Sequence, residues 1–284
     1  MLRKIFVDTS PAGLKFHIIE PFPDTTSPSH LPPLVLLVHG FPNLSYDWRF
    51  MMPKLAEAGY YAVAFDMRGF GRTHNADLCP ISESSFRPMT ALRDVVTLVR
   101  ALGYETVQHP GEEVTWPVPN IRSSLLKLDP PRKHCKYCNA SPGAAEEWTR
   151  PTGEPMHRFL RGYFHLKSAA YSLNKPRPLA SWTAEQLALS MRENVDLDML
   201  GGDTRWLTDA DLQVYTDEFP RNTFGPSLLW YKVLAGPGLS ADLLCFAGTK
   251  IGVPTKYVSG TSDWGTYQKP EESVKEILGL ARSV

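Results

Sequence analysis

The first hundred residues alternate between short apolar stretches and segments with helical spacing. Residues 3–8 and 14–20 have the composition of strands and are separated by a Ser-Pro-Ala-Gly turn, which predicts a hairpin. Residues 34–38 and 60–65 are continuous apolar runs, as expected for strands that are buried on both faces of a parallel sheet. The chain is therefore predicted to begin with a β-sheet.

Two further segments have the spacing of amphipathic helices. The first covers residues 47–58 and ends at Gly59, and the second covers residues 89–102 and ends at Gly103. Strands and helices that alternate in this way predict an α/β fold with a doubly wound, mostly parallel sheet. The positions expected to face the core are Trp48, Met51, Met52 and Leu55 in the first helix and Leu92, Val95, Val96, Val99 and Leu102 in the second.

The alternation stops after residue 108, where another buried strand is expected. Residues 109–119 are rich in proline instead, and residues 125–235 have helical, proline-interrupted and aromatic-rich sequence. Strand character returns at residues 255–259, and residues 271–280 have the pattern of a final helix. This order is typical of a helical domain inserted into a sheet domain.

We therefore expect three segments. Residues 1–110 form the N-terminal part of the sheet domain, residues 111–245 form a helical lid, and residues 246–284 form the C-terminal part of the sheet domain. The sheet is expected to be incomplete, because no strand pattern follows the helix at residues 89–102.

Charge and hydropathy exclude two classes of partner. Lys and Arg together number 30, as do Asp and Glu, and no block of like charges stands out, which argues against a nucleic-acid partner. The longest strongly apolar run, at residues 34–38, is far too short to span a bilayer. A cytoplasmic protein is expected.

The cysteines do not predict a metal site. Cys135 and Cys138 form a single C-x-x-C pair beside His134, whereas a structural zinc site needs a second pair of ligands. Only the distant Cys79 and Cys245 remain for that purpose. We predict neither a metal nor a cofactor.

Four motifs lie at comparable places relative to the predicted elements. They are HGFP at residues 39–42, Trp48-Arg49, DMRGFG at residues 66–71, and Ser262-Asp263-Trp264 near the end of the chain. In this combination the chain resembles an epoxide hydrolase of the α/β-hydrolase superfamily. The resemblance covers most of the chain and includes the lid, where Phe224-Gly225-Pro226 leads to Trp230-Tyr231.

The resemblance implies a reaction by way of an ester. In this family a carboxylate on a sharp strand-to-helix turn attacks an epoxide carbon, and lid tyrosines donate hydrogen bonds to the ring oxygen. A histidine oriented by an acid then activates water, which cleaves the ester while backbone N–H groups stabilise the oxyanion. The implied substrate is a small apolar epoxide or ester.

Carried over position by position, the resemblance gives roles to individual residues. Phe41 supplies one oxyanion N–H group, and the Phe41-Pro42 bond is cis. Tyr231 is a lid tyrosine, and Asp263 is the acid that orients the histidine. The second lid tyrosine aligns with Cys138, one residue from Tyr137. Asp66 and Arg68 are expected to tie neighbouring loops together. The residues expected to line the substrate site are His39, Pro42, Trp48, Tyr137, Trp230 and Trp264.

Simpler readings of two motifs stay open. HGFP can also be an ordinary Gly-Pro turn, and Tyr231 can be an aromatic residue packed on a helix.

The nucleophile of the family is not found in this sequence. Its turn has small residues on both sides of the nucleophile, opens a helix, and is expected just after residue 108. Glu112 and Glu113 are the nearest carboxylates, but Pro110 and Pro117 flank them and no helix pattern follows. The motif TSDWG at residues 261–265 has similar spacing, but Pro270 interrupts the helix that would have to follow it.

The catalytic histidine is not found either. In this fold it follows the acid along the chain, yet the last histidine, His165, precedes Asp263 by almost a hundred residues. Because the flanks of both gaps still match the family, we expect that two segments were removed by exon skipping or by a faulty gene model.

The sequence leaves three functions open. The chain is an epoxide-type hydrolase with strongly reduced activity, a non-catalytic module that binds small molecules, or a truncated chain without function. Loss of a central strand leaves backbone groups unpaired at a cost of about 1–3 kcal/mol each, so a marginally stable protein is expected.

Overall fold

The computed structural model describes residues 2–10, 13–21, 31–106, 126–127, 129, 131, 135–150, 154–170, 206–236 and 242. The described residues fall into two compact units, a sheet unit that ends at residue 106 and a helical unit that begins at residue 126. The predicted division at residues 110 and 245 remains a prediction.

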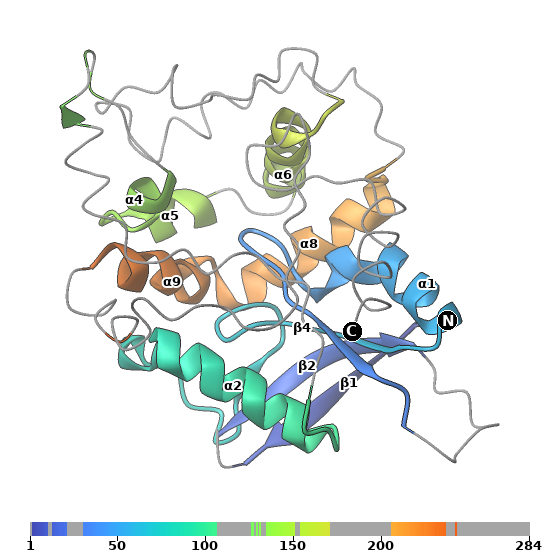
Figure 1. The fold of residues 1–284 in the computed structure, drawn as a ribbon. Coiled ribbons are helices and arrows are strands. Elements are labelled where there is room, and N and C mark those ends of the chain that lie inside the picture. Colours follow the sequence, from blue (N-terminus) through green and yellow to red (C-terminus); the bar gives the residue numbers. More distant parts are fainter. Residues whose placement is uncertain are drawn as a thin grey trace. The chain divides into compact units, whose positions relative to one another are not determined.

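The sheet unit contains five described strands (Figure 1). They are β1 (Leu2–Thr9), β2 (Leu14–Pro21), β3 (Leu34–Leu37), β4 (Tyr61–Phe65) and β5 (His74–Asn75). The strand order is β1-β2-β4-β3, with β5 paired to β2. β3 and β4 are parallel and all other pairs are antiparallel, so the sheet is mixed. The predicted hairpin and both buried strands are confirmed.

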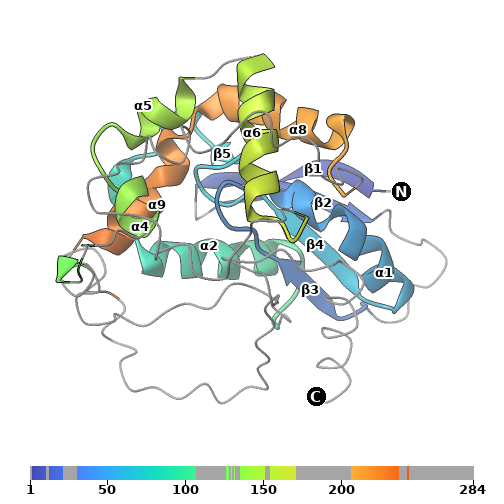
Figure 2. The same cartoon turned by 90° about the horizontal axis from the view of Figure 1, so that it is seen from above.

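Two helices lie on opposite faces of this sheet (Figure 2). Helix α1 (Met51–Glu57) packs on the face that carries Val35, and helix α2 (Pro88–Ala101) packs on the face that carries Leu36. Adjacent residues of a strand point to opposite faces, so both faces of β3 are covered and its four side chains are at most 2% exposed. The doubly wound arrangement is thereby confirmed for the described strands.

Three details of the predicted helices were wrong. The segment predicted as one helix begins as a 3₁₀ helix, η1 (Ser45–Phe50), and only then continues as α1. In α2, Leu92 and Val96 are each 48% exposed, whereas the other predicted positions, Val95, Val99 and Leu102, contact the core together with Leu98. A second 3₁₀ turn, η2 (Glu83–Ser85), precedes α2 and was not predicted.

The helical unit is built around aromatic side chains. Its helices are α4 (Cys135–Asn139), α5 (Ala144–Thr149), α6 (Glu154–Lys167), α8 (Asp209–Asn222) and α9 (Gly225–Ala235). α4 and α5 pack against α9, and α6 packs against α8. Buried rings in contact connect these helices, namely Trp148, Phe159, Tyr163, Phe164, Tyr215, Phe219 and Phe224.

Local sequence sets where α8 begins. The hydroxyl of Thr208 accepts a hydrogen bond from the Asp211 amide, and the Asp211 carboxylate accepts one from the Thr208 amide, which together form a capping box. The helical character predicted for residues 125–235 is confirmed at these five helices. The predicted elements at residues 255–259 and 271–280 lie outside the described residues. Within the described part of the chain, no helix is long and apolar enough to cross a membrane.

Candidate functional site

The HGFP turn directly follows β3 at the carboxyl end of the parallel strand pair. The Phe41-Pro42 peptide bond is cis, as the resemblance implied. The amide of Asn43 donates a hydrogen bond to the carbonyl of Gly40 at 3.1 Å, which closes the turn. His39 and Pro42 are buried, whereas Phe41 is half-buried. The turn therefore lies where ligands bind in open α/β sheets.

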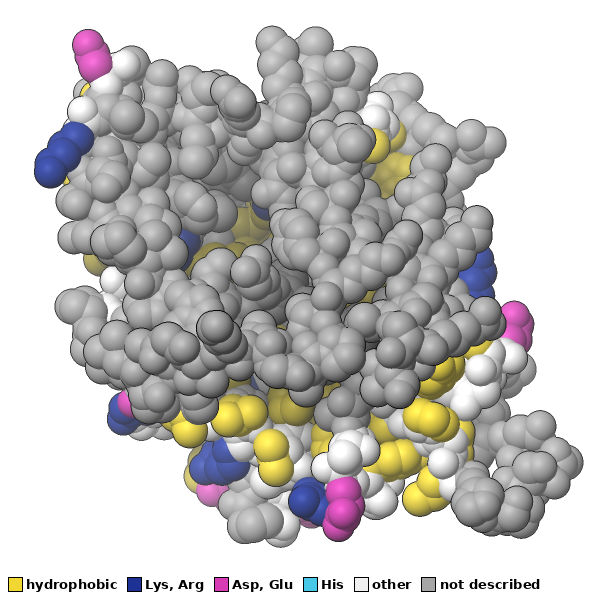
Figure 3. All heavy atoms as spheres, viewed as in Figure 1, with side chains coloured by type: hydrophobic (Ala, Val, Ile, Leu, Met, Phe, Trp, Pro, Cys, Tyr) yellow, Lys and Arg dark blue, Asp and Glu magenta, His cyan; other side chains and the backbone are white. Residues whose placement is uncertain are grey.

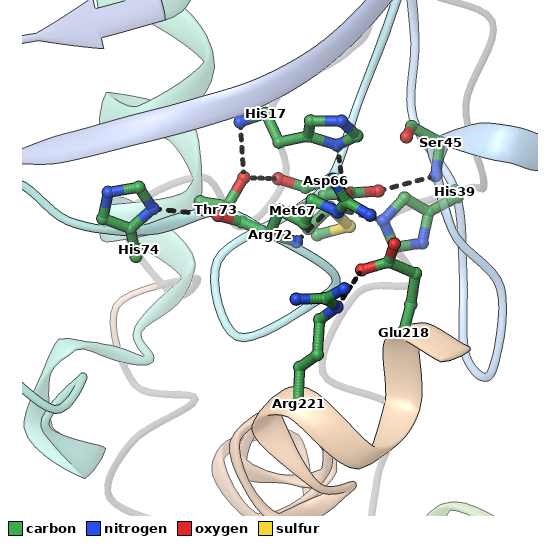
Figure 4. Close-up of polar contacts among 10 residues, drawn as sticks. All are labelled: His17, His39, Ser45, Asp66, Met67, Arg72, Thr73, His74, Glu218 and Arg221. Carbon is green, nitrogen blue, oxygen red and sulfur yellow. Dashed lines mark hydrogen bonds and ion pairs between the residues drawn. The ribbon is translucent and has the colours of Figure 1, made fainter. Parts of the chain in front are cut away.

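A buried carboxylate next to β4 fixes the segment that follows this turn. The Asp66 carboxylate accepts hydrogen bonds from the Ser45 amide at 2.9 Å, from His17 Nδ1 at 2.6 Å and from the Arg72 amide at 3.2 Å (Figure 4). Burial alone would raise the pKa of Asp66, but the hydrogen bond and the charge of His17, with smaller effects of His39 and Ser45, lower it to about 2. Asp66 thus connects β2, η1 and the DMRGFG loop as an ionised group.

The ring of His39 makes a second connection between the turn and the loop. Its Nδ1 lies 2.8 Å from the Gly40 carbonyl oxygen, and its Nε2 lies 3.1 Å from the Met67 amide nitrogen. A carbonyl can only accept and an amide N–H can only donate, so the proton is on Nδ1 and Nε2 is bare. Burial lowers the pKa of His39, against the opposing effect of Asp66, which favours this neutral form.

Packing and an ion pair fix the DMRGFG loop itself. The Phe70 ring lies edge-on to His39 at 4.7 Å and to Phe41 at 6.4 Å between ring centroids. Arg68 makes a bidentate ion pair with Asp94 of α2, at 2.7 and 2.8 Å, and both residues are buried. The predicted role of Asp66 and Arg68 in tying neighbouring segments together agrees with these contacts.

Gly71 is the loop position that leaves no room for a side chain. Its φ angle is +50°, and a Cβ atom placed there would lie 2.1 Å from the Asp66 carboxylate oxygen Oδ2. The Asp66 carboxylate accepts three hydrogen bonds and cannot move aside without breaking them.

We expect Gly71→Ala to lower the free energy of unfolding by about 3 kcal/mol, from left-handed strain of about 1–2 kcal/mol and loss of at least one hydrogen bond to Asp66. Urea unfolding measures the change. Gly59→Ala is the matched control, because Gly59 also has a positive φ, of +89°, but no atom lies within 4 Å of its Cβ position. An equal decrease in the free energy of unfolding in the two variants would contradict the proposed clash between a side chain at position 71 and Asp66.

The other predicted site residues fall into three groups. Trp48 lies in η1 of the sheet unit, where it is half-buried, and its Nε1 has no hydrogen-bond partner within the described structure. Tyr137 lies on α4, and Trp230 and Tyr231 lie on α9, the helix that packs against α4. Asp263 and Trp264 lie outside the described residues. Trp48 therefore packs against the core on the α1 side of the sheet, and Tyr137, Trp230 and Tyr231 lie on one helix pair.

Three residues that support the turn were not predicted from the sequence. His17 and Asp94 pair with Asp66 and Arg68 across 49 and 26 residues of sequence, and Phe70 contacts the turn directly. A polar residue inside an otherwise buried strand was the available signal for His17, because a buried imidazole needs a hydrogen-bond partner. Nothing local in the sequence points from Arg68 to Asp94.

Comparisons with known proteins agree with this geometry. A family profile described as "alpha/beta hydrolase fold" matches residues 33–107, which contain the turn and the DMRGFG loop. The chain is 28% identical to Epoxide hydrolase A of Mycobacterium tuberculosis over 279 residues, covering 89% of this chain and 82% of that protein. A solved epoxide hydrolase from an endophytic Streptomyces superposes with a TM-score of 0.65 and 26% identity, covering 86% of this chain and 75% of that chain.

A further relative shares more of its sequence with this chain than the two proteins above. Epoxide hydrolase 2 of Siraitia grosvenorii is 43% identical over 261 residues, and the match covers 81% of this chain and 75% of that protein. Identity at this level and coverage, together with the fold, leads to one conclusion. The chain belongs to the epoxide hydrolases of the α/β-hydrolase superfamily.

Proposed function

We propose that the protein is by descent a hydrolase that adds water to a small apolar epoxide, and that the chain as written lacks the segment that carries the nucleophile. The relatives that support the first part are themselves named epoxide hydrolases. The observation that carries the second part is the sequence after residue 108, where no Asp, Ser or Cys has glycine spacing on both sides and no helix pattern follows.

The family residues that this chain still contains fit the stabilisation of the oxygen atoms on which negative charge develops. The Phe41 amide lies in a turn that two buried side chains, His39 and Asp66, connect to the neighbouring loop. In the proposed reaction this amide stabilises the oxyanion that forms when water cleaves the ester, and Tyr231 donates a hydrogen bond to the epoxide oxygen. Asp263 is the proposed acid that orients a histidine.

The handedness of crossovers supports a position for the strand that the proposed segment would add. β3, α1 and β4 form one parallel crossover, and α2 lies on the opposite face from α1. Parallel crossovers are right-handed in almost all proteins, so a crossover on the opposite face must run in the opposite direction across the sheet. The strand that follows α2 therefore belongs beside β3, which pairs with β4 as its one described neighbour.

Tyr104 supports this placement. It directly follows the end of α2, its hydroxyl donates a hydrogen bond to the Pro32 carbonyl at 2.9 Å, and its ring stacks on Tyr61 at 6.0 Å. Pro32 and Tyr61 lie at the amino ends of β3 and β4. The chain thus returns to the edge of the sheet where the parallel strands begin. A further parallel strand that started there would end level with the HGFP turn.

The outer surface of α2 supports the loss of a helix. Met89, Leu92 and Val96 are 41%, 48% and 48% exposed, and their spacing places them on one stripe of the helix. Hydrophobic side chains also gather on the lower part of the surface in Figure 3, where Figure 1 draws α2. A nucleophile turn opens a helix, and a helix after a strand beside β3 would cover this stripe.

The transcript tests whether the segments exist in the cell. We expect reads across codons 108–111 and 269–270 to contain extra sequence that encodes a strand, a nucleophile turn and a helix at the first junction and a histidine at the second. Continuous reads through both junctions would show that the chain is complete as written. The proposal that the segments were removed from the gene model would then be wrong.

A binding module is the second candidate function. The turn and the α4–α9 pair keep an aromatic and partly buried character, with Phe41, Tyr137, Trp230 and Tyr231 all half-buried. Incubation with an aryl epoxide and an aryl ester separates the two functions. Turnover that is lost in Tyr231→Phe and in Asp263→Asn supports the enzyme, whereas saturable binding without turnover supports the module.

A further inference from the structure

The side chain of His39 has both ring nitrogens engaged by the backbone. The Nδ1–H group donates to Gly40, in the turn, and the bare Nε2 accepts from Met67, in the DMRGFG loop. The residue is 4% exposed, and the Phe70 ring packs edge-on against it. The expectation that His39 lines the substrate site stays a prediction, and these contacts point to a role in the turn itself.

We propose that His39 is a positioning residue that sets the direction of the Phe41 amide, and that it does so as the neutral tautomer with its proton on Nδ1. The two hydrogen bonds have opposite sense and reach in opposite directions from one rigid ring. They fix the backbone immediately before Phe41 relative to the loop after β4. The proposal rests on the proposed function only in that the Phe41 amide serves an oxyanion.

A second hydrogen bond, from Ser45 to Asp66, holds the other end of the turn. Asp66 accepts from the Ser45 amide on the far side of the turn, so the turn is connected to the same loop at both of its ends. Between these connections lie Phe41, the cis bond and the Asn43–Gly40 hydrogen bond. Loss of the Met67 connection should therefore rotate the amide of Phe41 without unfolding the turn.

Two amide variants separate the two hydrogen bonds. In His39→Gln the side-chain carbonyl reaches the position of Nε2 and can accept from Met67. In His39→Asn the shorter side-chain amide reaches only the position of Nδ1 and can donate to Gly40. His39→Phe keeps an aromatic ring against Phe70 but makes neither hydrogen bond, so it reports on packing alone.

Nuclear magnetic resonance on protein selectively labelled with ¹⁵N-His, ¹⁵N-Met and ¹⁵N-Phe tests the proposal without any need for turnover. In the unmodified chain the His39 ring nitrogens should show the Nδ1-protonated pattern, with a through-hydrogen-bond coupling to the Met67 amide. His39→Asn should raise the exchange rate of the Met67 amide roughly tenfold, the loss expected for one hydrogen bond. It should also shift the Phe41 amide signal. His39→Gln should restore the exchange rate of the Met67 amide, because its side-chain carbonyl accepts from that amide.

Each contrary result overturns the proposal. An Nε2-protonated His39 in the unmodified chain would refute the tautomer even if every variant failed to fold. A Phe41 signal that is unchanged in His39→Phe would show that packing alone sets the turn, and so would a His39→Gln variant that behaves like His39→Asn. Because none of these readouts involves an epoxide, they stand whether or not the chain is a hydrolase.

Discussion

A chain that regains both proposed segments should hydrolyse an aryl epoxide about a millionfold faster than the chain as written, the loss measured when a nucleophile or histidine is removed from a comparable catalytic unit. The segments are taken from the 43% identical plant relative and inserted after Gln108 and between Lys269 and Pro270. The first provides a nucleophile at the carboxyl end of a strand beside β3, level with the HGFP turn. The second provides a histidine after Asp263. Product formation under saturating substrate measures the gain.

Single insertions separate folding from chemistry. The first segment alone should raise the thermal midpoint by roughly 5–10 °C, because a new strand pairs with β3 and a new helix covers the apolar stripe on α2. It should not restore turnover. The same segment with an asparagine in place of its nucleophile is the matched control and should stabilise equally. An insertion that leaves the midpoint unchanged would contradict the position assigned to the strand.

Replacement of Arg68 by methionine should strongly destabilise the sheet unit. Asp94, which is 3% exposed, would lose both hydrogen bonds from the Arg68 guanidinium, and breaking one side of a buried ion pair costs about 3–5 kcal/mol. This is a large part of the total stability of a typical domain. Urea unfolding followed by tryptophan fluorescence measures the loss.

Two further variants identify the cause. Arg93→Met removes the more exposed partner of Asp94, whose guanidinium lies 3.6 Å away, and should cost less than about 1 kcal/mol. Arg68→Met combined with Asp94→Leu should recover most of the stability, because no charge is then left buried. If Arg68→Met costs no more than Arg93→Met, the buried pair does not anchor the loop to α2.

Much of the sheet unit could be predicted from local pattern. The runs at residues 34–38 and 60–65 gave β3 and β4 within one residue at each end, because strands covered on both faces are apolar throughout. The pattern failed in α2, where apolar residues occupy more of the helix than the sheet covers. Leu92 and Val96 have the periodicity of core positions, but their environment depends on whether another element packs there.

The candidate site could be predicted only in part, for a different reason. The motifs placed the turn after β3 and the DMRGFG loop after β4, since binding loops follow strands in this class of fold. The hydrogen bonds from His17 and Ser45 to Asp66 join segments 49 and 21 residues apart, and no periodicity encodes such pairs. The Asp66 carboxylate also binds the amide of Ser45, the first residue of the 3₁₀ helix η1 after the turn.

The most direct test of the account is the rate at which the purified chain as written hydrolyses an aryl epoxide, compared with buffer and with Tyr231→Phe. We expect a rate that equals the buffer rate within error and does not change in the variant, because the proposed nucleophile segment is missing from this sequence. Saturable turnover that falls in Tyr231→Phe would contradict it, and would mean that a carboxylate already present in this sequence attacks the epoxide.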